Sequence, residues 1–236
     1  MRNYTDSSLY YYSKNWNRFI ICVKSALSNE MKQCLDDPDS FIDKGVLLKN
    51  GNSSTVSSVK INNTQLVIKR YNIKDHVHAV SRAFRPSRAS VSWENAHLLD
   101  ECHIATAAPV AFLEYRCGFL RSTSYLITEL KAGDSCSDYF NSDKHSDVDK
   151  KKAAYSIVDI LKKLKALKIT HGDLKLSNII IYNTGASLID LDSMKRHKNN
   201  TSFLKAHEKD MGRFFLNWKN DDKNRNLFLD IFNNEK

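Results

Sequence analysis

The stretch that decides the fold of this 236-residue chain is HGDLKLSN, residues 171–178, followed by the apolar residues 179–181 and by LIDLD at 188–192. Phosphoryl transfer from ATP needs a carboxylate that orients the attacking hydroxyl, a second carboxylate that holds Mg²⁺ on the phosphates, and an amide oxygen that completes the metal site. The spacing H-x-D-x-x-x-x-N places the first carboxylate, Asp173, and the amide, Asn178, on one loop. Asp190 supplies the second carboxylate at the end of a short apolar strand. The stretch therefore predicts a phosphotransferase site.

Each of these residues alone is weak evidence, because an aspartate before an apolar run is often only a turn or cap residue. The context strengthens the prediction. Ser146 begins a capping-box-like sequence, and apolar residues recur at helical spacing from there to Lys168. A long helix is therefore expected to lead directly into His171, as such a catalytic loop requires.

The residues before 131 are typical of an antiparallel sheet with one helix. Strands are expected at Val46–Leu48, Thr55–Ile61, Gln65–Tyr71, Pro109–Leu113 and Tyr125–Leu130, with a helix over 87–100. Lys69 closes the third strand, where a lysine contacts the α- and β-phosphates of ATP in kinases, and Glu94 lies on the following helix within reach of it. A lysine at a strand end is often only solvated, and a glutamate on a helix is often only a surface charge, but here the two occur in the right order ahead of the catalytic loop.

Composition narrows the function further. The net charge of +9 favours an anionic partner without choosing among nucleic acid, a membrane surface and a phosphorylated substrate. The seven glycines show neither the G-x-G-x-x-G nor the G-x-x-x-x-G-K-[ST] spacing, which argues against Rossmann dinucleotide binding and P-loop hydrolysis.

The five cysteines lack a C-x-x-C pair, which argues against a zinc site and a disulfide framework and favours reduced, packed thiols in the cytosol. No transmembrane or secretory segment is expected, since the longest apolar run is Phe19–Val23.

Residues 1–45 are expected to form a helical extension. Apolar side chains fall on one helical stripe, while Arg18, Lys24 and Lys32 lie off it. Such a stripe usually packs on its own domain, although it could also belong to a membrane-surface helix. The members of the stripe are Trp16, Phe19, Ile20, Val23, Leu27, Met31 and Cys34.

With these motifs in place, the chain resembles the lipopolysaccharide core sugar kinases, the heptose and Kdo kinase group of the protein-kinase-like superfamily. The catalytic loop is shared across that superfamily. The block R-x-F-R-P-S-R-A-x-x-x-W-E-N-A-H at residues 82–97 is what indicates this group, together with LVIKRY at 66–71 and IATAAP at 104–109. The similarity covers roughly residues 46–215.

The resemblance implies an α+β, two-lobed kinase fold, with a five-stranded antiparallel N-lobe carrying one helix at 46–130 and a reduced helical C-lobe at 131–236. It implies Asp173 as catalytic base and Lys175 near the transferred phosphate, with ATP and Mg²⁺ as cofactors. The metal ligands would be Asn178 and Asp190. Lys69 would contact the ATP phosphates with Glu94 as its ion-pair partner, and Glu129 and Leu130 would lie at the hinge beside adenine.

The sequence departs from the superfamily pattern at three places. The glycine-rich loop keeps only Gly51, so phosphate contacts would come from backbone N–H groups and the hydroxyls of Ser53, Ser54 or Thr55. Asp190-Leu191-Asp192 replaces D-F-G, which leaves Asp192 as a further ligand or a surface residue. No A-P-E element follows, and a short lobe suits a small or glycan acceptor better than a peptide.

The expected function is phosphorylation of a heptose or Kdo hydroxyl of the lipopolysaccharide inner core, at the cytoplasmic face of the inner membrane. The partner would be this glycolipid or another anionic glycan, with peripheral membrane contact and no nucleic acid. The basic segment 69–88 is either a patch for such an anion or a solvated face. Two other functions stay open: a small atypical Ser/Thr protein kinase linked to tRNA modification, and a pseudokinase scaffold, which the filled catalytic positions disfavour.

Overall fold

The structure, a computed structural model, describes residues 7–72, 85–118 and 120–234. The chain divides into two compact units. Unit 1 comprises Met1–His97 and Ala108–Leu130, and unit 2 comprises Leu98–Ala107 and Lys131–Lys236.

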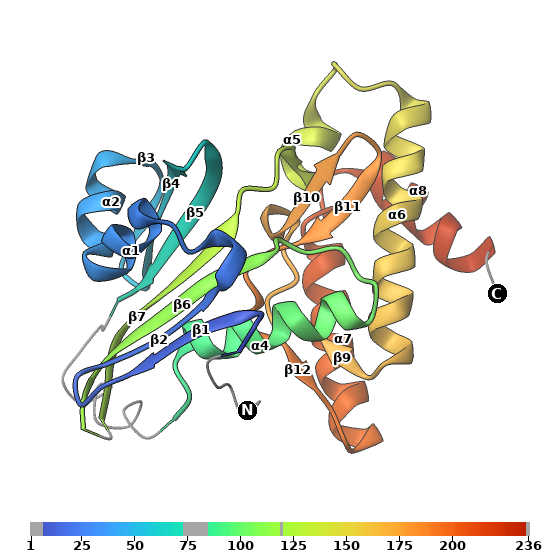
Figure 1. The fold of residues 1–236 in the computed structure, drawn as a ribbon. Coiled ribbons are helices and arrows are strands. Elements are labelled where there is room, and N and C mark those ends of the chain that lie inside the picture. The colour runs from blue at the N-terminus through green and yellow to red at the C-terminus, as the bar shows by residue number, and fades with distance from the viewer. Residues whose placement is uncertain (1–6, 73–84, 119, 235–236) are drawn as a thin grey trace. The chain divides into compact units, whose positions relative to one another are not determined.

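Unit 1 is built on a seven-stranded antiparallel sheet with the order β1-β2-β6-β7-β5-β4-β3 (Figure 1). All five strands predicted between residues 46 and 130 are present, and Asn62 and Asn63 form the predicted turn, with φ of 48° and 64°. Left-handed pairs of this kind suit two-residue hairpin loops. The strands are β1 (Tyr10–Lys14), β2 (Arg18–Val23), β3 (Val46–Gly51), β4 (Ser54–Ile61), β5 (Thr64–Tyr71), β6 (Pro109–Cys117) and β7 (Leu120–Glu129).

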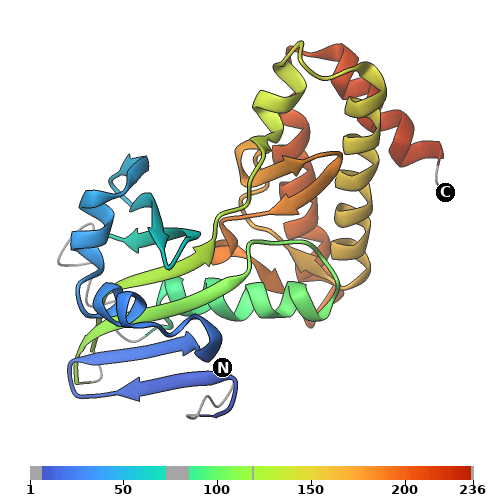
Figure 2. The ribbon, with the colours of Figure 1, turned by 45° about the horizontal axis from the view of Figure 1, so that its top comes forward.

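The predicted strand count of five is wrong because β1 and β2 come from the segment expected to be helical (Figure 2). In β2, Ile20 and Cys22 belong to one core cluster and Ile21 to another, so the strand is buried on both faces. A short continuous apolar run fits such a strand as well as a helix, and periodicity cannot separate the two. The membrane-surface helix is thereby excluded for β2.

Helices cover both faces of this sheet. On one face, α1 (Asn29–Asp36) and α2 (Pro38–Lys44) contribute Met31, Cys34 and Ile42 to a cluster with strand residues such as Ile68. These positions confirm that the later part of the predicted stripe packs on its own domain. On the other face, α4 (Arg88–Glu101) contributes Trp93, which is fully buried. A single turn of 3-10 helix, η1 (Lys24–Ala26), links β2 to α1.

Unit 2 combines helices with two small antiparallel sheets. The helix predicted before the catalytic loop is α6 (Asp147–Ala166), and Ser146 caps it by accepting a hydrogen bond from the Asp149 N–H. Phe140, Phe214, Trp218 and Phe228 stack edge to face and tilted in one aromatic cluster. The other helices are α5 (Cys136–Asn141), α7 (Asn200–Leu216) and α8 (Asp222–Asn234). The sheets are β8 (Asp134–Ser135) with β10 (Ile179–Tyr182) and β11 (Gly185–Leu188), and β9 (Ile169–Thr170) with β12 (Lys195–Arg196).

Candidate active site

Asp173 lies at the centre of the loop between β9 and β10 in unit 2. Its carboxylate accepts hydrogen bonds from Arg213 Nη1 at 2.7 Å, Lys175 Nζ at 3.1 Å and Asn178 Nδ2 at 3.3 Å. A carboxylate offers about four acceptor positions, so one remains for a substrate hydroxyl. The side chain is 26% exposed, which keeps this position accessible. The structure thus brings together three residues that the sequence predicted and one that it did not.

The backbone of the loop that carries Asp173 is held by the side chain of Asp210 on α7. This carboxylate is 5% exposed and accepts hydrogen bonds from the N–H groups of His171 at 2.6 Å and of Gly172 at 3.0 Å. Gly172 has a φ of 79°, and a Cβ there would lie 2.4 Å from the Ser193 carbonyl oxygen. Because both the conformation and the close approach require glycine, Gly172 and Asp210 together fix the backbone that carries Asp173.

Asn178 and Asp190 are brought together by the β10–β11 pair. Ile179 pairs with Leu188, and the Ile189 N–H donates a hydrogen bond to the Asn178 carbonyl at 3.0 Å. Asp190 is the next residue after Ile189, so this bond holds its backbone close to that of Asn178. Asp190 has left-handed backbone angles, φ 63° and ψ 59°, and it turns the chain into the short helix η3 (Leu191–Ser193).

The side chain of Asn178 is oriented by the same loop. It is 8% exposed, and its Nδ2 donates to the Asp173 carbonyl at 2.9 Å. Since the amide nitrogen is engaged with Asp173, the amide oxygen Oδ1 is the atom left to act as a ligand. Within residues 7–72, 85–118 and 120–234, no three His, Cys, Asp or Glu side chains form a metal cluster. An amide and a carboxylate nevertheless suit a Mg²⁺ ion that takes its remaining ligands from water and phosphate.

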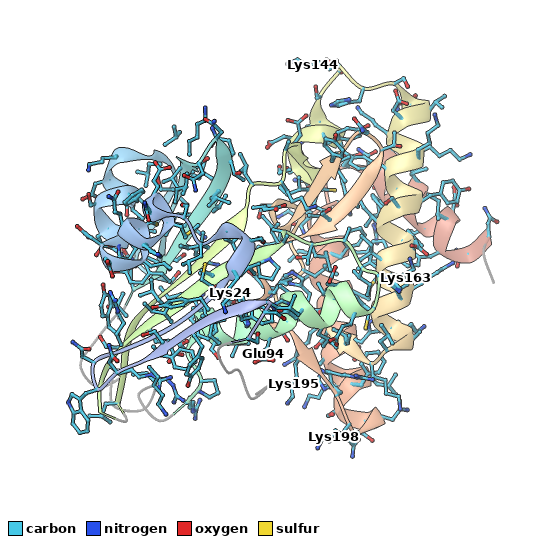
Figure 3. The ribbon with its side chains drawn as sticks, viewed as in Figure 1. Lys24, Glu94, Lys144, Lys163, Lys195 and Lys198 are labelled. Atoms are coloured by element: carbon cyan, nitrogen blue, oxygen red, sulfur yellow. The ribbon has the colours of Figure 1, made fainter. Side chains whose placement is uncertain are left out.

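Lys69 and Glu94 both belong to unit 1. Lys69 lies on β5 between Val56 and Leu126. Tyr71, two residues on, belongs to the cluster that α4 covers, and its hydroxyl is 2.9 Å from Ser92 Oγ on that helix. Alternate strand residues share a face, so Lys69 lies on the sheet face covered by α4. Figure 3 labels Glu94 on that helix.

The hairpin between β3 and β4 holds the remaining predicted phosphate contacts. Arg88 on α4 donates to the Ser53 carbonyl at 3.1 Å, and its guanidinium lies 4.7 Å from the centre of the Tyr71 ring. Asn72 donates to the Gly51 carbonyl at 3.0 Å. Ser54 is only 1% exposed, whereas Ser53 is half-buried. The hairpin tip is therefore fixed by side chains from outside it, and Ser53 presents more of its surface than Ser54 does.

Glu129 and Leu130, predicted at the hinge, end the unit 1 sheet. The Glu129 N–H donates to the Ala108 carbonyl at 2.9 Å, and the Leu130 N–H donates to the Gln65 carbonyl at 3.0 Å. Unit 2 resumes at the next residue, Lys131. Since both N–H groups are used within unit 1, neither is left to donate a hydrogen bond to a base.

A comparison with protein-family models extends over most of the chain. Residues 45–230 match the model described as the lipopolysaccharide kinase (Kdo/WaaP) family. The chain belongs to the lipopolysaccharide kinase (Kdo/WaaP) family. The resemblance drawn from the sequence is thus confirmed, and membership implies a kinase, that is, a phosphotransferase.

A solved structure described as "WaaP in complex with acyl carrier protein" is similar to this kinase in fold. The TM-score is 0.60 at 16% sequence identity, with 88% of each chain covered. No curated protein sequence matches the chain. None of the described helices is both long and apolar enough to cross a bilayer.

Sequence reasoning missed Asp210 and Arg213 of this kinase. Both lie in a charged stretch of α7 that looks like a solvated helix face. A signal was present, because Phe203, Asp210 and Phe214 fall on one helical stripe and all three are buried. An aspartate in a core position needs partners, and here they are the N–H groups of the loop. Most of the basic segment 69–88 lies outside the described residues, since 73–84 are not among them.

Proposed function

We propose that this chain is a Mg²⁺- and ATP-dependent kinase that transfers the γ-phosphate to a sugar hydroxyl, of heptose or Kdo, in the lipopolysaccharide inner core. The observation that carries the proposal is the Asp173–Asn178 loop, joined to Asp190 through the Ile189 hydrogen bond, in a member of the lipopolysaccharide kinase family.

Asp173 is the proposed catalytic base. The hydroxyl of the acceptor would take the remaining acceptor position of its carboxylate, which orients the oxygen for in-line attack. Lys175 lies 3.1 Å from the same carboxylate and is half exposed, so it can turn from Asp173 toward the transferred phosphate. Its charge would offset the negative charge that develops there.

Asn178 Oδ1 and the Asp190 carboxylate are the proposed Mg²⁺ ligands. The ion, when bound with ATP, neutralises the phosphates during transfer. What the chain supplies is orientation, because Asn178 is buried and tied to Asp173 while Asp190 is set by its left-handed backbone. The side chain of Asp192 accepts a hydrogen bond from Ser193 Oγ at 3.1 Å, so we give it no ligand role.

We further propose that residues 46–130 act as the N-lobe and 131–236 as the C-lobe of the kinase. In the N-lobe, Lys69 would contact the α- and β-phosphates and Glu94 would hold Lys69. Gly51 and Ser53, at the hairpin tip fixed by Arg88, would lie over the phosphates through backbone N–H groups. Glu129 and Leu130 would lie at the hinge beside the adenine.

The experiment that tests the function is mass spectrometry of dephosphorylated lipopolysaccharide core after incubation with the protein, Mg²⁺ and ATP. A gain of one phosphate is expected, and fragmentation then identifies the sugar. Asp173→Asn should abolish the gain. Asp159→Asn is the matched control, because Asp159 is exposed on α6 and pairs with Lys163 one turn along the same helix, and this variant should retain full transfer.

The atypical protein kinase and the scaffold would each give a different result in the same assay. Phosphate on a protein substrate with none on the glycolipid would favour the atypical protein kinase. Binding of ATP without transfer to either substrate would favour a scaffold. Equal transfer by wild type and Asp173→Asn would contradict the assignment of the base.

A further inference from the structure

Unit 2 carries an exposed set of cations where β12 leads into α7. Residues 195–209 contain five Lys or Arg side chains and one acid, Glu208, and all six are exposed. Lys168, also exposed, joins them because its carbonyl accepts the His197 N–H at 2.8 Å. We call this set the basic face: Lys168, Lys195, Arg196, Lys198, Lys205 and Lys209.

The basic face is held on a rigid support. His197 is 8% exposed, its Nε2 lies 2.8 Å from Thr170 Oγ1, and its Nδ1 lies 3.3 Å from Ser202 Oγ. Its ring also contacts Phe203 in an edge arrangement with centroids 6.0 Å apart. β12 is thereby fixed to β9 and to the first turn of α7. Figure 3 shows Lys195 and Lys198 at the end of unit 2 where β12 runs into this helix.

The charges of this face are not neutralised within the described chain. No described acid forms an ion pair with any of its six members. On α6, by contrast, Lys163 pairs with Asp159 at 2.8 Å. The pKa of His197 is lowered first by burial and then by Lys195, against a smaller opposing effect of Asp210. Uncompensated cations of this kind attract an anionic surface.

The face continues along α7 to the catalytic loop. Lys205, Lys209 and Arg213 follow one another at intervals of four, so they form one row on the helix. The row ends where Arg213 contacts Asp173. Eight residues of helix span about 12 Å. A surface that touches the start of the row therefore lies close to the catalytic carboxylate.

An exposed leucine distinguishes between possible anionic partners. Leu204, beside Lys205, is 52% exposed. A leucine among cations suits the boundary between headgroups and acyl chains, whereas single-stranded nucleic acid is held by exposed aromatic rings. The only aromatic side chain in 195–209 apart from histidine is Phe203, which is buried.

We propose that the basic face docks unit 2 on an anionic lipid bilayer, with Leu204 entering the headgroup region and Arg213, which contacts Asp173, about 12 Å along α7 from Lys205. That the docked loop acts on a glycolipid acceptor rests on the proposed function. The docking itself does not, so the two can fail separately.

The test is sedimentation of the full chain with vesicles of phosphatidylcholine, alone or mixed with phosphatidylglycerol. Binding is expected only to the mixed vesicles and should be lost near 1 M salt, where the Debye length is about 3 Å. Each cation near the surface contributes about 1 kcal/mol, so Lys195→Ala/Arg196→Ala/Lys198→Ala should bind roughly 100-fold more weakly. Lys150→Ala/Lys151→Ala/Lys152→Ala, on α6, removes the same charge and should bind like wild type.

Folding and activity are checked alongside. Both triple variants should match the wild type in circular dichroism and in transfer to soluble, deacylated core sugar, if the proposed function holds. Equal loss of vesicle binding by both variants would overturn the inference, since it would show a response to net charge alone. So would wild-type indifference to phosphatidylglycerol, or RNA that displaces the vesicles and binds more tightly than they do.

Discussion

Asp210 gives the sharpest prediction about loop 171–178, the proposed catalytic loop. Asp210→Ala removes the acceptor of one buried hydrogen bond, from the His171 N–H, and of one partly buried bond, from the N–H of the exposed Gly172. A buried donor left without a partner costs roughly 1–3 kcal/mol, so loss of the His171 bond should lower the free energy of unfolding by about 1–3 kcal/mol. The exposed Gly172 N–H can bond to water instead and adds little. Asp210→Asn can keep an oxygen at the position that accepts both N–H groups, so it should lose less than Asp210→Ala.

The same change should impair transfer beyond its effect on stability. The loop that Asp210 holds carries Asp173, and displacement of a base by about 1 Å costs on the order of 100-fold in rate. Turnover should therefore fall in the fraction of Asp210→Asn that remains folded, with little change in the KM for ATP.

Urea unfolding followed by circular dichroism measures the first effect, and steady-state kinetics at a temperature where the variant is folded measures the second. Asp230→Ala, an exposed position on α8, should change stability by less than about 0.5 kcal/mol. If Asp210→Ala unfolded at the same urea concentration as the wild type, the hydrogen bonds from His171 and Gly172 to Asp210 would not stabilise the loop, which would refute this prediction.

Three further predictions concern Arg213, Glu114 and two histidines. Arg213→Met should lower turnover about tenfold, equivalent to about 1.4 kcal/mol of barrier, because it removes the donor 2.7 Å from the carboxylate of Asp173, the proposed base. Its stability should change by at most about 1 kcal/mol, since the pair is exposed, and unchanged kinetics would contradict a positioning role. Glu114 is fully buried and accepts two hydrogen bonds from Arg116, so Glu114→Ala should destabilise unit 1 by about 3–5 kcal/mol in urea unfolding; a loss below about 1 kcal/mol would contradict this. Burial lowers the pKa of both His197 and His207. Near pH ~6.5 the unfolded chain therefore binds more protons than the folded chain, so the free energy of unfolding should fall as the pH drops from about 7.5 toward about 5.5. His197→Gln/His207→Gln should flatten that dependence, and an unchanged slope between wild type and variant would rule out these groups as its source.

Local patterns were enough to place three of the predicted site residues on one loop; their roles stay a prediction. Asp173, Lys175 and Asn178 lie within six consecutive residues, and their mutual contacts follow from one tight loop after a capped helix. The strands of 46–130 were likewise readable, because alternation and turn residues such as Asn62 are local signals.

What sequence reasoning missed depends on contacts between distant segments. Asp210 and His171 are 39 residues apart in the sequence, and the sequence of α7 alone does not show that its side chain bonds to the loop. The interpretation of residues 18–23 as helix failed for a related reason. Their burial on both faces arises only when β6 and the helices of unit 1 pack around them, and a run of five apolar residues does not reveal that.

The place of β2 in the sheet has consequences for how this kinase folds during synthesis and for how far it can be truncated. Ile20 pairs with Leu113, so the sheet cannot close until more than a hundred residues have been synthesised. Pairing between such distant segments is slow, and the early chain is exposed to misassociation meanwhile. The family match begins only at residue 45, beyond β1 and β2. A chain cut to that boundary would leave β6 as an open edge, a template for joining other chains. In the full chain β1 and β2 cover the edge of β6, so this edge cannot pair with another chain.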